Sequence, residues 1–124
     1  MKKNLKENET LLLIPKATEY TEYMIDVILK IPRTEKYSIG NEYKQSTYRM
    51  INMIIYLTKL PKAERLRQLN EIDCELNIQR ILLRIMCKKH WIDKKKFEVA
   101  MDKLGEVGKI LGGLIKYYGK DNKE

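Results

Sequence analysis

The 124-residue chain is poor in the features that mark secretion, membrane insertion and disulfide bonding. Its apolar run at residues 11–14 (Leu-Leu-Leu-Ile) is too short for the apolar core of a signal peptide, and no run approaches the roughly 20 apolar residues of a membrane span. Cys74 and Cys87 would lie about 20 Å apart on one helix, which is too far for a disulfide bond. We therefore expect a cytoplasmic protein whose two cysteines are small buried hydrophobes in a reducing compartment.

Patterns typical of catalytic and metal sites are also missing. The single histidine, His90, has no nucleophile placed with it, and we expect it to pack a turn together with Trp91. No Cys/His group has zinc-ligand spacing, and the C-terminal glycines lack the Gly-Lys-Ser/Thr of a phosphate-binding loop. Glu71, Asp73 and Glu75 point in divergent directions on a helix. The sequence therefore predicts a protein that is not an enzyme and that has no metal and no cofactor.

Positive charge is in excess. Lys and Arg number 25 against 17 Asp and Glu, which gives a formal net charge of +8 and a pI near 9.4. A small basic domain favours a polyanionic partner, either nucleic acid or an anionic membrane surface. The alternative is that lysines reflect solubility or genome composition.

Three prolines and the apolar periodicity predict four helices. Pro15 precedes the first and Pro32 ends it, Ser38 is a candidate N-cap of the second, and Asp93 of the fourth. No alternating β-branched run or hairpin turn competes. We expect an all-α, antiparallel up-down-up-down four-helix bundle over residues 15–119, a flexible segment at 1–14 and, after Gly119, a frayed tail at 120–124. The helices are expected at 16–31, 38–60, 62–88 and 93–119.

Each predicted helix has an apolar face with helical spacing. The four faces consist of Tyr20, Tyr23, Met24, Val27, Ile28 and Ile31; Ile39, Tyr43, Ser46, Met50, Ile54 and Leu57; Leu69, Ile72, Leu76, Leu83 and Cys87; and Phe97, Met101, Leu104, Gly108, Leu111 and Ile115.

The predicted third helix has a second apolar row, and the second helix has a shorter one. A bundle has one interior, so a helix that is apolar on two faces indicates a second partner, often another subunit. We expect a homo-oligomer; the alternative is that residues 11–14 fold back over the row. The predicted interface residues are Tyr48, Ile51, Ile55, Cys74, Ile78, Ile81 and Ile85.

A basic strip lies beside that row. Arg80, Arg84 and Lys88 are spaced i, i+4, i+8, so their side chains share one face of the helix, and the planar arginine fork suits phosphate. The alternative is a solvated face without a ligand. Weaker candidates for contact with nucleic acid or a protein partner are Lys44, Arg49, Lys59 and Lys62.

A pair of aromatic residues lies near basic side chains at the end of the last helix. Tyr117 and Tyr118 adjoin Lys116 and Lys120. Tyrosines next to lysines can stack nucleobases, although packing of the helix end is the alternative.

Glycines interrupt the predicted fourth helix. Gly105, Gly108 and Gly112 fall within about 60° of one another, and each costs about 0.5–1 kcal/mol relative to alanine. Either this part of the helix is poorly formed, or the glycines allow close packing against another helix, within the bundle or across a subunit interface.

Two segments resemble the Avd family, the accessory variability determinants of diversity-generating retroelements. The first is Ile-Pro-Arg-Thr-Glu-Lys-Tyr-Ser-Ile-Gly-Asn-Glu-Tyr at residues 31–43. The second comprises residues 78–84 and 93–116 and includes Gly-Glu-Val-Gly-Lys-Ile-Leu-Gly-Gly at 105–113. The chain departs from many members at Leu114, where tryptophan often stands. The related bundle proteins encoded in ribosomal RNA intervening sequences carry a second-helix motif that residues 43–49 lack.

The resemblance implies a four-helix bundle that assembles as a barrel-like homopentamer. It also implies a non-enzymatic accessory protein that binds the retroelement's reverse transcriptase and its template RNA, with DNA or an RNA–DNA hybrid as alternative ligands, and thereby supports mutagenic cDNA synthesis. Arg80 and Arg84 lie both in a matched segment and in the basic strip, so they are the first candidates for this contact. The alternative is a structural oligomerisation scaffold, or a ribosomal RNA intervening-sequence protein without a reverse-transcriptase partner.

Overall fold

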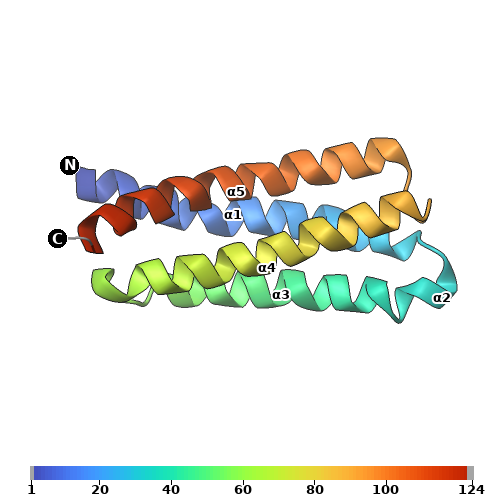
Figure 1. Cartoon of the computed structure of the whole chain (residues 1–124), viewed down its shortest axis with the longest axis horizontal. Helices are drawn as coiled ribbons and strands as arrows, with labels where there is room; N and C mark the ends of the chain where they lie inside the picture. Colours follow the sequence, from blue (N-terminus) through green and yellow to red (C-terminus); the bar gives the residue numbers. More distant parts are fainter. Residues whose placement is uncertain (1, 123–124) are drawn as a thin grey trace.

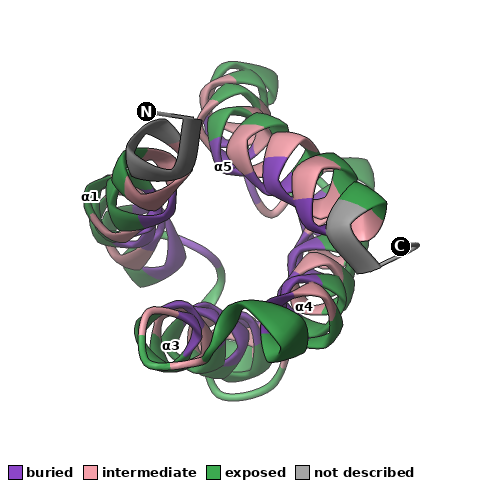
Figure 2. Cartoon of the chain, turned by 90° about the vertical axis from the view of Figure 1, so that its left-hand side faces the viewer, coloured by how far each residue is buried: buried purple, intermediate pink, exposed green. Residues whose placement is uncertain are grey.

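The described part of the chain forms four long antiparallel helices (Figure 1). The computed structural model describes residues 2–122, with side chains from residue 6 to residue 120. Each long helix packs on two others, in the order α1, α3, α4, α5 and back to α1. Buried residues face the common centre in the end-on view (Figure 2). The predicted all-α four-helix bundle is therefore confirmed. The helices are α1 (Lys2–Leu29), the one-turn α2 (Arg33–Lys36), α3 (Ile39–Leu57), α4 (Lys62–Lys88) and α5 (Lys94–Asn122).

The limits of the last two long helices follow their sequence signals. α4 begins directly after Pro61, and α5 begins after Asp93, whose Oδ1 accepts a hydrogen bond from the backbone N–H of Lys96 at 2.8 Å. An N-cap residue makes this hydrogen bond with the first turn of its helix. Ser38 precedes α3 as predicted, but its hydroxyl donates to Glu35 instead of capping the helix.

The first helix begins earlier than predicted. Pro15 lies inside α1, although a proline in a helix interior costs about 3 kcal/mol. Tertiary contacts of the preceding turns offset this cost, because Leu13 and Thr10 are buried and Glu7 forms an ion pair with Arg65 of α4. The expected start of the bundle at residue 15 is therefore wrong, because α1 already begins at Lys2; residue 1 of the expected N-terminal segment lies outside the described part of the chain.

The last helix ends later than predicted. α5 continues through Gly119 to Asn122, so Gly119 does not terminate it. Residues 123–124 of the expected frayed tail lie outside the described residues.

The predicted apolar faces of the first three long helices form the core, apart from Cys87, Tyr23 and Ile39, which are half-buried. On α5 the buried face is rotated by about 60° from the predicted one. Val107, Leu114 and Tyr118 are buried, whereas the predicted Phe97 and Ile115 are only half-buried. Gly108, which the prediction placed on the apolar face, is half-buried on the flank of α5 that faces Arg80 of α4.

Polar side chains in the core form one connected chain of hydrogen bonds. Tyr20 donates to Oε1 of Gln79 at 2.9 Å and accepts from Tyr43. Gln79 Nε2 donates to Ser46 Oγ at 3.1 Å, and Ser46 donates to Glu75 Oε2 at 2.7 Å. This chain joins α1, α3 and α4, and it satisfies the amide of Gln79, which is fully buried.

None of the described helices combines the length and the apolar character needed to cross a membrane.

Candidate nucleic-acid interface

The predicted strip of basic residues lies on the flank of α4 next to α5. Arg84 and Lys88 are exposed, whereas Arg80 is half-buried and donates from Nη1 to Asn77 Oδ1 at 3.0 Å. Among the described side chains, no carboxylate forms an ion pair with Arg84 or Lys88. Arg84 therefore presents its planar fork to solvent, in the form that phosphate recognition requires.

Gly108 makes room for Arg80. A Cβ atom at Gly108 would lie 2.8 Å from Nη2 of Arg80, so the guanidinium lies directly against the backbone of α5. A Cβ atom at Gly105 or Gly112 would meet nothing within 4 Å. Close packing within the bundle is therefore wrong for Gly105 and Gly112, and packing across a subunit interface stays a prediction. The alternative of a poorly formed helix is wrong too, because α5 is continuous through all three glycines.

The positive charge of Arg80 also acts on Tyr20, a buried tyrosine of the core. Burial raises the pKa of the Tyr20 phenol above its ordinary value, and the positive charge of Arg80 acts in the opposite direction. A substitution of Arg80 thus changes the packing at Gly108 and the field at Tyr20 as well as the surface charge. Arg84 is the cleaner residue for a test of ligand binding.

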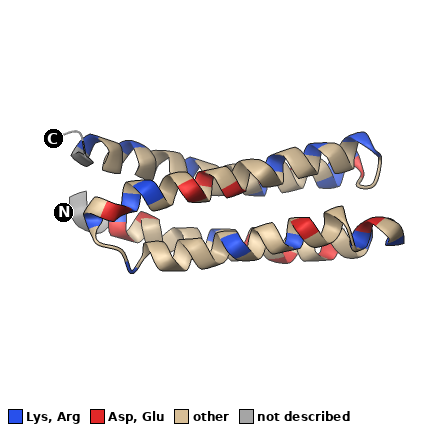
Figure 3. Ribbon diagram, turned by 60° about the horizontal axis from the view of Figure 1, so that its bottom comes forward, with Lys and Arg blue, Asp and Glu red and all other residues tan. Residues whose placement is uncertain are grey.

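The other predicted contact residues do not join this strip. Arg49 pairs with Glu75 across the α3–α4 contact at 3.0 Å, and this hydrogen bond raises the pKa of Arg49. Lys44 is half-buried on α3. Lys59 and Lys62 are exposed at the α3–α4 turn, and Lys62 lies about 39 Å from Lys88 along α4. Basic residues are distributed along the bundle and at its ends (Figure 3), so the seven predicted residues are not one site.

The predicted second apolar row of α4 is exposed. Ile78, Ile81 and Ile85 have relative exposures of 46%, 55% and 39%. Cys74 in the same row is also exposed and Cys87 is half-buried, so the expected burial of both cysteines is wrong; both thiols are free.

The alternative cover for this row is excluded. Residues 11–14 belong to α1, which packs on α3 and α5, and they do not fold back over α4.

The shorter row of α3 is a separate patch. Tyr48 and Ile55 are exposed and Ile51 is half-buried. Arg49 marks the flank of α3 that faces α4, and Ile51 and Ile55 lie more than about 100° around the helix from it. The two rows therefore offer two apolar surfaces and not one continuous face.

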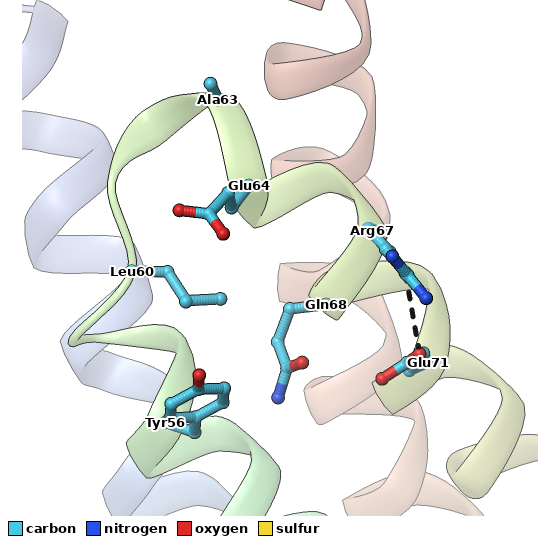
Figure 4. Close-up of a pocket in the computed structure, with 7 residues that line it drawn as sticks. All are labelled: Tyr56, Leu60, Ala63, Glu64, Arg67, Gln68 and Glu71. Carbon is cyan, nitrogen blue, oxygen red and sulfur yellow. Dashed lines mark ion pairs between the residues drawn. The ribbon is translucent and has the colours of Figure 1, made fainter.

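Arg84 does not line either of two cavities in the described part of the chain. The first cavity, of about 420 Å³, lies between the end of α3 and the start of α4 (Figure 4). The ion pair of Arg67 with Glu71 lies at its edge. This cavity is lined by Tyr56, Leu60, Ala63, Glu64, Arg67, Gln68 and Glu71. A second, of about 580 Å³, lies at the α4–α5 turn. Its lining is Cys87, His90, Ile92, Asp93, Lys94, Phe97 and Glu98.

His90 has a structural role in the α4–α5 turn. It takes the left-handed conformation with a φ of 63°, and the N–H of Trp91 donates to the carbonyl of Met86 at 2.9 Å. This is the hydrogen bond of a Schellman motif at a helix C-terminus. Asp93, the carboxylate next in sequence, caps α5 and does not orient the imidazole. In the described residues, no group of three or more His, Cys, Asp or Glu side chains could hold a metal ion.

Two of the buried polar residues that sequence reasoning missed have structural roles. Gln79 is fully buried in the core network, and Arg65 is buried between Glu7, Tyr118 and the carbonyl of Leu60. The helical period places both residues on the core side of α4. A polar side chain is expected to be exposed unless its hydrogen-bond partners are known, and these partners lie on other helices or in the turn.

The chain matches a known protein family. A family model described as bAvd-like matches residues 11–118, which is nearly the whole chain. No curated protein matches. The match includes the loop after the first helix and the glycine-containing segment of α5 that carry the resemblance to Avd proteins. The chain belongs to the bAvd-like family.

Proposed function

We propose that the protein is a non-enzymatic accessory factor of a diversity-generating retroelement, which binds the reverse transcriptase and its template RNA and supports mutagenic cDNA synthesis. Membership of the bAvd-like family carries this proposal. The net charge of +8 supports a polyanionic ligand, and the exposed Arg84 and Lys88 offer phosphate contacts on one flank of α4.

Self-association would strengthen such a surface. The exposed isoleucines of α4 are an apolar patch that a second copy of the chain would cover, and the resemblance to Avd proteins implies five copies. A closed ring repeats Arg84 and Lys88 around its axis, so the fields of several modest strips add.

Salt-dependent binding of template RNA tests this proposal. We expect the affinity to fall steeply with salt, and Arg84→Glu to weaken binding by tenfold or more and to lower the salt slope by about 1. Arg67→Glu is the matched control, because Arg67 is an exposed arginine of the same helix outside the strip. Fluorescence anisotropy at several salt concentrations measures both quantities.

Two results would contradict the proposal. One is an RNA affinity that does not change with salt. The other is an equal loss of affinity in Arg67→Glu and Arg84→Glu, which would show that RNA is held only by nonspecific electrostatic attraction.

A structural oligomerisation scaffold is the second candidate, and the exposed row of isoleucines favours it. A scaffold forms a stable oligomer and retains no RNA at physiological salt. A neighbouring reverse-transcriptase gene, together with a template repeat that varies at adenines, favours the retroelement role.

A further inference from the structure

A buried arginine fixes one corner of the bundle. The start of α1 and the end of α5 lie side by side at the end that also carries the α3–α4 turn (Figure 1). Arg65 of α4 donates to Glu7 of α1 at 2.5 Å, to the hydroxyl of Tyr118 of α5 at 2.9 Å and to the carbonyl of Leu60 at 3.0 Å. Its side chain is only 8% exposed. These bonds hold together three helices and the turn, so the side chains around them are positioned before any ligand arrives.

A small pocket opens at this corner, and three of its five lining residues are lysines. Its volume is about 180 Å³, and it is lined by Lys6, Gly113, Lys116, Tyr117 and Lys120. Like charges that converge on one pocket repel each other, and an anion between them removes the repulsion. Lys6 forms an ion pair with Glu9 at 3.1 Å, which leaves the corner with a net excess of positive charge among its described side chains.

An aromatic ring forms one wall of the pocket. The Nζ atom of Lys6 lies 5.5 Å from the ring centre of Tyr117, so a phosphate bound to Lys6 is next to this ring. Tyr118 packs edge-on against Tyr117 with ring centres 5.0 Å apart, and Arg65 lies over Tyr118. The ring of Tyr117 is therefore held in place through Tyr118 by the Arg65 corner. Rings combined with lysines are the usual means of binding unpaired nucleotides.

The size of the pocket favours a polymer as ligand. Pockets that enclose a whole small molecule measure about 300–1,000 Å³, and this one is smaller. It accommodates a phosphate group of a larger ligand better than a complete nucleotide. A paired base cannot reach the ring of Tyr117, because both of its faces are stacked in the duplex.

We infer that the pocket formed by Lys6, Lys116 and Lys120 binds a backbone phosphate of single-stranded nucleic acid, and that the adjoining unpaired base contacts the ring of Tyr117. This inference rests on the proposed function, since it adds a second nucleic-acid contact to that of Arg84. The two contacts lie on different flanks of the bundle, so separate substitutions address them.

A substitution that fills the pocket without a change of charge is the sharpest test. A Cβ atom at Gly113 meets nothing within 4 Å, so the first side-chain atom of Gly113→Leu has room, and leucine improves the helix propensity of α5. We expect Gly113→Leu to weaken binding of an unstructured RNA of about ten nucleotides by about tenfold, while thermal stability is unchanged or higher. Fluorescence anisotropy and thermal unfolding monitored by circular dichroism measure the two effects.

Charge and stacking variants separate the two parts of the site. Lys116→Glu should weaken single-strand binding about tenfold, and Lys109→Glu, an exposed lysine of the same helix outside the pocket, less than about threefold. Tyr117→Leu should weaken binding about fivefold or more, whereas Tyr117→Phe, which keeps the ring, should bind like the wild type. A duplex RNA of the same length should lose much less affinity from these changes.

Several results would overturn the inference. Wild-type affinity in Gly113→Leu would show that no ligand enters the pocket, and equal losses in Lys109→Glu and Lys116→Glu would show diffuse attraction. A mononucleotide or inorganic phosphate that competes as well as the oligonucleotide would show a site for a free phosphate compound instead of a strand. Binding to anionic lipid vesicles in place of RNA would show a membrane contact.

The inference and the proposed function can fail separately. If Arg84→Glu abolishes binding of template RNA while every pocket variant binds the oligonucleotide like the wild type, the pocket assignment is wrong and the function stands. If the pocket variants lose the oligonucleotide while Arg67→Glu and Arg84→Glu lose equal affinity for template RNA, the proposed function is contradicted and the pocket stands.

Discussion

At the scale of single residues, the core of the bundle depends on polar side chains that satisfy each other. Tyr43, Tyr20 and Gln79 are fully buried, yet each finds a hydrogen-bond partner on another helix. An unsatisfied buried group costs about 1–3 kcal/mol, so removal of the central member, Gln79, is more damaging than removal of an end. The hydroxyl of Tyr43 is such an end, because it donates to Tyr20 and Tyr20 donates onward.

The buried tyrosines make stability sensitive to alkaline pH. Burial raises the pKa of Tyr20 and Tyr43 above the ordinary value of 10.0. Their contribution is fully present below pH 10, where the unfolded chain also keeps the proton, and it is lost as the pH rises through the folded pKa. Each such group lowers the free energy of unfolding by about 1.4 kcal/mol per pH unit in that window.

We expect Tyr43→Phe to cost about 1 kcal/mol at neutral pH and to make the decline of stability above pH 10 shallower. Urea unfolding at a series of pH values from neutral to strongly alkaline measures both effects. Tyr37→Phe, at a tyrosine that is 80% exposed, serves as the control and should leave the decline unchanged. An equal slope in Tyr43→Phe and the wild type would show that Tyr43 ionises alike in both states.

At the scale of helices, α5 combines a packed face with a side on which three glycines recur. The buried face includes Leu104, Leu111 and Leu114, and Gly105, Gly108 and Gly112 share another side of the helix. Only Gly108 has a reason within the chain, because Arg80 lies against it. Gly105 and Gly112 either lower the stability of the helix without a compensating contact, or they face another subunit.

Alanine substitutions distinguish these two roles. We expect Gly105→Ala and Gly112→Ala each to raise the free energy of unfolding by about 0.5–1 kcal/mol, because the new Cβ atoms meet open space. Gly108→Ala should raise the free energy of unfolding by less, since its Cβ atom displaces the Arg80 guanidinium. Urea unfolding together with the mass in solution is the measurement. A lower stability of Gly105→Ala, with a lower mass, would instead place this flank at a subunit interface.

At the scale of the whole molecule, the bundle buries one apolar core and leaves the predicted apolar rows of α4 and α3 largely exposed. The isoleucine row of α4 lies opposite the core, and the patch with Tyr48 and Ile55 lies on another side of α3. Two separate patches on one chain are what a head-to-tail ring requires, since each copy then contacts two neighbours through different surfaces.

We expect the wild-type protein to be an oligomer, and Ile81→Glu to lower its mass without a change in helical content. The reason is that a buried unpaired carboxylate at the interface is strongly unfavourable. Light scattering coupled to size exclusion measures the mass, and circular dichroism measures the helix. Leu29→Glu, at an exposed apolar residue of α1 outside the row, is the control and should leave the mass unchanged. A monomeric wild type would refute the predicted interface.

The apolar periodicity and the prolines determined the number of long helices, the limits of α4 and most of the core, because helix register depends on local spacing. They failed at Pro15, where contacts of Glu7 and Leu13 with other helices outweigh the local cost. They also misplaced the face of α5, because glycine has no side chain with which to mark the core side. The sequence by itself also carried the family membership, through the segments around residues 31–43 and 105–113.

Only the tertiary structure decided which charged residues remain available for a ligand. It paired Arg49 with Glu75, buried Arg65 at the corner and set Arg80 against Gly108, and it left Arg84 exposed. It also brought Lys6 next to Tyr117, although they are far apart in sequence. These outcomes depend on partners from other helices, and the position of such partners is set by packing in three dimensions and not by spacing along one helix.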